Sequence, residues 1–215
     1  PFCMVLDEMK FSHVKRYFAY FLSHMGAPDL WFVLDGYPGV LRYPENLFVV
    51  GTVNIDETTY MFSPKVLDRA NVIEFKPEEN SVLDLFVNPA DNENINPASD
   101  GTAEAFEKMA ALIRAGKSNL EVDILVEIQS VFKRIYEIVE KSGYEFAYRT
   151  VREIRQYLSA AYELTEDKET FDFYSIIDEQ LIQKILPKIH GNNKEIGGLL
   201  EELGALCVEY NLPLS

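Results

Sequence analysis

The chain has 215 residues, of which 47% are hydrophobic and 26% are charged. This composition excludes a disordered chain and fits one large globular domain or two small ones. The formal net charge is -15, and residues 76–215 carry 26 acidic but only 14 basic residues, which makes this part a poor candidate for binding nucleic acid by neutralising phosphates. No apolar run approaches the roughly 20 residues that a membrane-spanning helix needs, so no membrane contact is expected.

The first predicted element is a buried strand at residues 2–6, whose apolar run is typical of a parallel sheet covered on both faces. Asp7 and Glu8 follow it directly. Ligands of such sheets bind just beyond the carboxyl ends of the strands. There one of the two carboxylates can hold Mg²⁺, which takes oxygen ligands, and the other can orient or deprotonate a water molecule. The alternative is a strand that simply meets solvent at a charged turn.

The start of the chain and its cysteines indicate its context. The sequence begins at Pro1 inside the first predicted strand and shows no signal-peptide pattern, so we expect it to be a piece of a longer protein. Cys3 and Cys207 lie far apart in apolar surroundings, which favours buried free thiols in a reducing cytoplasm. The three histidines have no metal-ligand spacing, and no structural zinc is expected.

A second buried strand is predicted at residues 47–53, ending at Asn54. Apolar residues at helical spacing predict a helix at 11–25 before it, and residues 31–34 fit a short strand within an insertion or hairpin. If the first and second buried strands are parallel neighbours, Asn54 emerges beside Asp7. Its amide can then hold a water and a terminal phosphate at once, because it both donates and accepts. Otherwise Asn54 merely begins a turn.

A short helix is predicted from Pro64 to Ala70, followed by a third strand at residues 72–75. The helix carries Arg69, which at a subunit edge would reach a phosphate held by a neighbouring subunit. As an alternative, Arg69 is an ordinary surface residue. Residues 77–101 are rich in Pro, Asn, Asp and Glu and are interpreted as a connector with a short element at 82–87.

From residue 102 the pattern becomes purely helical, with apolar stripes typical of a bundle. The expected helices span 102–115, 120–141, 148–163, 172–186 and 194–210. In the third of these, the predicted buried stripe consists of Val151, Ile154, Leu158 and Ala161. Arg149 is unusual because it lies in the first turn, where the helix dipole disfavours a cation. Glu145, Glu153 or an anionic ligand would compensate its charge.

Several segments in order resemble the second half of AAA+ nucleotide hydrolases and, more narrowly, the McrB-like subunits of modification-dependent restriction systems. The Walker B strand and the next helix of that family are similar to Leu6-Asp7-Glu8-Met9 and to Phe11-Ser12-His13-Val14-Lys15-Arg16-Tyr17-Phe18. Its sensor 1 strand is similar to Val50-Gly51-Thr52-Val53-Asn54, and its arginine-finger segment to Phe62-Ser63-Pro64-Lys65-Val66-Leu67-Asp68-Arg69-Ala70. The sensor 2 segment and the end of its lid resemble Phe146-Ala147-Tyr148-Arg149-Thr150-Val151 and Gln183-Lys184-Ile185-Leu186-Pro187-Lys188-Ile189-His190-Gly191.

The resemblance implies an α/β fold followed by an all-α lid domain. Residues 1–76 would form the C-terminal half of the AAA+ core, a partial sheet of the Walker B, sensor 1 and last strands. Residues 77–101 would connect this core to a helical lid at 102–215.

The same resemblance assigns roles to individual residues. It implies that Asp7 supports Mg²⁺, that Glu8 polarises the attacking water and that Asn54 helps to place it. Arg69 would act as an arginine finger in the neighbouring subunit's site, and Arg149 would sense the phosphates of GTP or ATP. The implied assembly is a homo-oligomeric ring, a hexamer, with a partner endonuclease subunit, and it would contact DNA indirectly through domains outside this chain.

The chain departs from the family pattern at three places. Lys10 stands where the family often has Asn, and the segment after Asn54 lacks the Arg of the GTP-specific signature, so GTP and ATP both stay open. No G-x-x-x-x-G-K-[ST] motif, the loop that cradles the phosphates, occurs in the sequence. The fragment by itself is therefore expected to be inactive.

Two other functional classes are open. In one, the acidic helical part is a non-catalytic interaction or oligomerisation module of a defence complex, and the strands are a remnant. In the other, Asp7 and Glu8 hold the metal of a nuclease, with Lys10 as the only candidate lysine. A nuclease would also need a third acidic residue from another strand, and no such pattern is clear.

Overall fold

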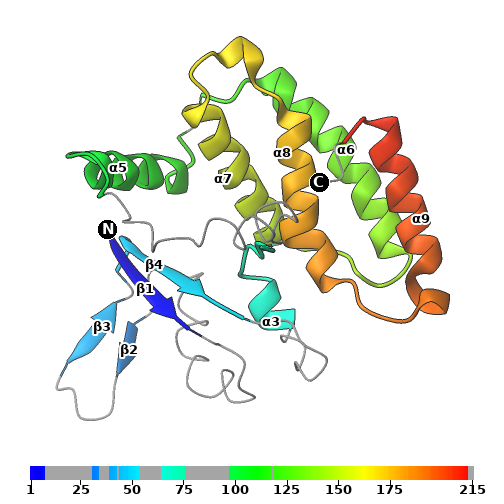
Figure 1. Ribbon diagram of the computed structural model, residues 1–215, viewed down its shortest axis with the longest axis horizontal. Helices are drawn as coiled ribbons and strands as arrows, with labels where there is room; N and C mark the ends of the chain where they lie inside the picture. Colours follow the sequence, from blue (N-terminus) through cyan, green and yellow to red (C-terminus); the bar gives the residue numbers. More distant parts are fainter. Residues whose placement is uncertain are drawn as a thin grey trace, which may run out of the picture.

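The computed structural model describes residues 1–7, 31–33, 39–42, 44–53, 64–75, 97–117 and 119–212. In chain order, the strands β1 (Phe2–Leu6), β2 (Trp31–Val33), β3 (Val40–Arg42) and β4 (Leu47–Gly51) come first, followed by the short helix α3 (Pro64–Leu67). The helices α5 (Thr102–Arg114), α6 (Val122–Glu140), α7 (Tyr148–Leu164), α8 (Phe173–Gln180) and α9 (Asn193–Glu209) follow. The described part of the chain is thus mostly helical, and its strands lie together near the N-terminus (Figure 1).

The two apolar strands pair as the sequence predicts. β1 and β4 are parallel, with Phe2 opposite Leu47 and Leu6 opposite Gly51. The pairing continues beyond the strands, because the Thr52 N–H donates to the Leu6 carbonyl over 3.0 Å. β2 and β3 form an antiparallel pair, which confirms the predicted short strand in a hairpin. Both chain segments that follow β1 and β4 therefore leave the sheet at the same edge.

The third predicted strand is wrong for the part of the chain that the structure describes. Residues 71–75 form no strand, and the described strands pair only as β1 with β4 and β2 with β3. A strand exists only where a neighbour accepts and donates its ladder hydrogen bonds. In this segment the Val72 N–H instead donates to the carbonyl of Gln183 in the helical part, over 3.1 Å.

The main core lies between α6, α7, α8 and α9, which form a bundle (Figure 1). The buried residues of α6 are Ile128, Val131, Ile135 and Val139. In α7 the buried stripe begins at Thr150 and continues through Ile154 and Leu158, whereas the predicted member Val151 is 51% exposed. A polar residue, Thr150, thus takes the first buried position of α7, where its hydroxyl donates a hydrogen bond to Asp68, just after α3.

The helix expected at 172–186 is interrupted. α8 ends at Gln180 and continues as a π-helical turn, η2 (Leu181–Ile185), and a 3₁₀ turn, η3 (Leu186–Lys188). An α-helix would pair the Gln183 carbonyl with the N–H of residue 187, but Pro187 has none and its ring crowds that carbonyl. The Gln183 carbonyl is therefore left available, and Val72 occupies it.

The helix α5 contacts both α7 of the bundle and the sheet. The Phe106 ring packs edge-on against Phe48 of β4, with 4.9 Å between the ring centroids. The Arg114 guanidinium carbon lies over the Phe48 ring, 5.4 Å from the ring centroid. Among the described residues no helix is long and apolar enough to cross a membrane.

Candidate functional site

The carboxyl ends of β1 and β4 bring Asp7 beside Thr52, whose hydroxyl donates a hydrogen bond to the Asp7 carboxylate. Both side chains offer oxygen atoms, the donor type that Mg²⁺ takes, and one carboxylate completed by phosphate oxygens and water is a common magnesium site. In the described ranges no group of three or more His, Cys, Asp or Glu side chains is placed to hold a metal by itself. Glu8 and Asn54, the other residues predicted at this edge, lie outside the described residues.

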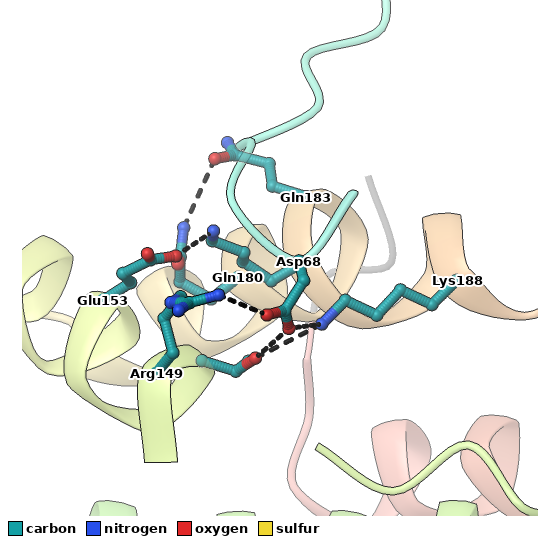
Figure 2. A network of polar contacts seen from close by, with 8 residues as sticks. Asp68, Arg149, Glu153, Gln180, Gln183 and Lys188 are labelled. Atoms are coloured by element: carbon teal, nitrogen blue, oxygen red, sulfur yellow. Dashed lines mark hydrogen bonds and ion pairs between the residues drawn. The ribbon is translucent and has the colours of Figure 1, made fainter. Parts of the chain in front are cut away.

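A second polar cluster joins α3 to the helical bundle (Figure 2). Asp68, just after α3, accepts hydrogen bonds from three side chains of the helical part. Arg149 Nη1 donates to one carboxylate oxygen over 3.0 Å, and Lys188 Nζ and Thr150 Oγ1 donate to the other over 3.1 and 3.3 Å. Lys188 Nζ also lies 3.2 Å from Thr150 Oγ1. Thr150 is buried on α7, and its hydroxyl donates a hydrogen bond to Asp68, which explains a polar residue at this position.

The charges of this cluster keep Asp68 ionised. Burial disfavours the charged carboxylate, but the hydrogen bond and charge of Lys188 and the charge of Arg149 outweigh it, so the pKa of Asp68 lies below its ordinary value of 3.8. Since the folded-state pKa is the lower one, the stability that this carboxylate contributes is present above pH 3.8 and is lost as the pH falls through the folded-state value. The contact is therefore fully formed at neutral pH.

Asp68 is the functional residue that sequence reasoning missed. We expected Glu145, Glu153 or a ligand to compensate Arg149 at the start of α7, but the carboxylate comes from Asp68. Glu153 instead forms an ion pair with Lys184, whose side chain is only 2% exposed. The unfavourable position of Arg149 in the first turn of its helix did indicate that an acidic partner is needed. Its partner lies 81 residues earlier in the chain, and no local pattern pointed to it.

Arg69 lies at the same junction, half-buried beside Arg149. Its Nη1 atom is buried and has no hydrogen-bond partner. Burial and the charge of Arg149 lower the pKa of Arg69, while the carboxylates of Asp68 and Glu153 act in the opposite direction. The Arg69 side chain is thus not an ordinary surface residue. Its contact with a phosphate in a neighbouring subunit stays a prediction. A buried donor without a partner is costly, so this guanidinium is set up to gain from an added acceptor.

A comparison with known protein families matches the helical part of this chain. The profile of a domain of unknown function, DUF8727, aligns with residues 100–215, which is more than half of the sequence. The chain belongs to the DUF8727 family. No curated protein and no solved structure matches the chain. The DUF8727 domain contains Arg149, Thr150 and Lys188, whereas Asp7, Asp68 and Arg69 come from the segment before it.

Proposed function

We propose that this chain is the C-terminal part of a McrB-like AAA+ nucleotide hydrolase, in which GTP or ATP hydrolysis drives a DNA restriction or defence complex. The observation that carries the proposal is the parallel, in-register pairing of β1 with β4. This pairing sends Asp7 and the segment leading to Asn54 out of the sheet at one edge, the arrangement that a Walker B and a sensor 1 strand require. A loop that binds the phosphates would come from sequence before Pro1.

In this proposal each residue has a separate task. Bound Mg²⁺ neutralises the phosphate charge, and Asp7, supported by the Thr52 hydroxyl, helps to hold the ion. Glu8 takes or orients the proton of the attacking water, and Asn54 holds that water in place. Arg69 contacts the phosphates bound by the next subunit of a ring, where an arginine finger can contribute roughly 10³–10⁵ in rate. Arg149 contacts the phosphates from the lid.

The proposal extends to the assembly and its place in the cell. Because Arg69 acts on a neighbouring site, the working form is a ring, which we propose to be a hexamer, in the cytoplasm. A partner endonuclease uses the motion, and DNA is contacted by domains outside this chain. The 215-residue chain by itself should not hydrolyse nucleotide, because it has no phosphate-cradling loop.

The test is steady-state hydrolysis of GTP and of ATP by the longer parent protein, comparing wild type with Glu8→Gln. We expect the substitution to lower kcat by about 10²-fold or more, because it removes the base that activates water. Glu104→Gln is the matched control, since Glu104 is an exposed residue of α5 that forms an ion pair with Lys108 on the same helix. It should hydrolyse nucleotide like the wild type.

The preferred nucleotide in this assay decides between a GTPase and an ATPase. Equal activity of wild type and Glu8→Gln, or no activity in either, would contradict the hydrolase proposal. It would favour the interaction module, in which the acidic DUF8727 domain binds a partner and the strands have no catalytic task.

A further inference from the structure

The cations of the DUF8727 domain that face α3 are neutralised from outside the domain. Arg149 and Lys188 come from α7 and η3, which lie far apart in the sequence, and both donate to the one carboxylate of Asp68 (Figure 2). Glu153, the acidic residue nearest to them on α7, is engaged by Lys184. The domain therefore presents a two-cation site with a hydroxyl donor, Thr150, and an acidic side chain from the preceding segment occupies it.

The balance of charge in this site favours a stronger anion than Asp68. Arg149 and Lys188 both donate to the Asp68 carboxylate, and Arg69 lies within the electrostatic reach of Asp68 and Glu153. The Arg69 Nη1 donor is buried without an acceptor. The site is also open to water, since the side chains of Asp68 and Arg149 are 34% and 38% exposed. Ion pairs with this exposure are weak and exchange readily. A phosphate group, with more charge and more acceptor oxygens than a carboxylate, would satisfy these donors better.

We propose that Asp68 is a displaceable internal occupant of an anion site formed by Arg149, Lys188 and Thr150, and that a phosphate group competes with it and releases the α3 segment from the helical domain. The inference that Asp68 occupies an anion site depends only on the observed contacts. The inference that phosphate is the competing anion depends on the proposed function. Because Arg69 directly follows Asp68, exchange of the occupant would also free the guanidinium that the proposed function assigns to a neighbouring subunit.

A second contact shows what release would change. After Asp68 and Arg69, the chain is attached to the domain by the hydrogen bond from Val72 N–H to the Gln183 carbonyl, which Pro187 leaves without a helical partner. This backbone bond and the Asp68 contacts act on the same short segment. Loss of the Asp68 contacts should therefore raise the rate at which the Val72 amide exchanges with solvent.

The first test uses calorimetric titration of the 215-residue chain with inorganic pyrophosphate. Asp68→Asn keeps the shape of the side chain but removes the competing charge, and we expect it to bind pyrophosphate about tenfold more tightly than wild type. Adding Arg149→Gln or Lys188→Gln to Asp68→Asn should abolish that gain. Asp100→Asn, an exposed position outside the cluster, makes the same change in net charge and should leave the affinity unchanged.

The second test uses the wild-type Asp68, so its result is informative even if Asp68→Asn folds poorly. Pyrophosphate added to the wild-type chain should accelerate hydrogen exchange at Val72, and Arg149→Gln should remove this response. The proposal is overturned if Asp68→Asn binds no more tightly than wild type, if the gain survives loss of both cations, or if Val72 exchange ignores pyrophosphate. Neither test measures hydrolysis. A negative result for displacement of Asp68 is therefore distinguishable from a negative result of the Glu8→Gln experiment.

Discussion

Individual side chains of one type meet very different surroundings in this molecule. Cys3 lies on β1 and is exposed, whereas Cys207 on α9 is buried at 1% exposure in the helical core. Burial disfavours the thiolate, and the negative charge of Asp178 adds to this effect, so the pKa of the Cys207 thiol is raised. The thiolate is the reactive form of cysteine, which makes the two sites distinguishable by chemistry.

We predict that only Cys3 reacts rapidly with a thiol reagent in the folded chain at pH 7–8. Cys207 should react at least about 100-fold more slowly, because it must be both uncovered by an opening of the core and deprotonated. The measurement is the time course of thiol modification in wild type and in Cys3→Ser, with and without denaturant. A fast reaction of folded Cys3→Ser would show that α9 is not packed as described.

The ends of the helices show how local sequence determines an element. α9 begins with a capping box, in which the Asn192 side chain accepts from the backbone N–H groups of Lys194 and Glu195 and the Glu195 side chain accepts from the Asn192 N–H. These bonds satisfy donors that have no partner within the helix. Pro187 acts in the same local way at the 3₁₀ turn η3, because an α-helix would need its missing N–H as the partner of the Gln183 carbonyl.

Asn192→Ala should lower the free energy of unfolding by about 1 kcal/mol, because the first-turn N–H groups of α9 lose their acceptor. For a chain of this size the loss corresponds to a fall in Tm of roughly 2–4 °C. Thermal unfolding followed by circular dichroism measures both. Glu201→Ala, an exposed site in the middle of the same helix, is the control and should change Tm little. Equal effects of the two substitutions would contradict the role of the cap.

At the scale of the whole molecule, the described core belongs to the helical part. Ile135, Ile177 and Val139 are fully buried between α6, α8 and their neighbours. On the sheet, by contrast, Phe2 and Val5 of β1 are 67% and 62% exposed, and Cys3 is exposed as well. The prediction that this strand is buried on both faces is therefore wrong, and with it the prediction of a buried Cys3. The helical part therefore supplies most of the apolar burial among the described residues, and the strands are connected to it through α5 and through the Asp68 junction.

Ile135→Ala should lower the free energy of unfolding of the helical part by about 2–5 kcal/mol, since it removes buried methyl groups and leaves a cavity. Urea denaturation followed by far-UV circular dichroism gives this value from the shift of the midpoint. Val122→Ala, at a position that is 72% exposed at the start of α6, is the matched control and should change stability by less than about 0.5 kcal/mol. Similar midpoints for the two variants would place Ile135 outside the core.

The sequence by itself indicated the bundle helices, the two apolar strands β1 and β4 and the short strand in the hairpin, because each depends on a local apolar period or on an apolar run between breakers. It left the parallel pairing of β1 with β4 as a condition, and it did not show the interruption after α8. It also marked Arg149 as a cation in an unfavourable position. It did not determine whether residues 72–75 form a strand, since a strand depends on a neighbour elsewhere in the chain. Glu8 and Asn54, on which the proposed chemistry depends, stay sequence predictions.

Only the tertiary structure decided what Arg149 binds and what becomes of Arg69. The packing of α3 against α7 and η3 brings Asp68, Arg149 and Lys188 within hydrogen-bond distance, although they are separated by up to 120 residues. The same packing buries the Nη1 atom of Arg69 and turns Thr150, rather than Val151, toward the interior. Sequence period predicts which face of a helix is buried, but the identity of a charged side chain's partner depends on which segments meet in space.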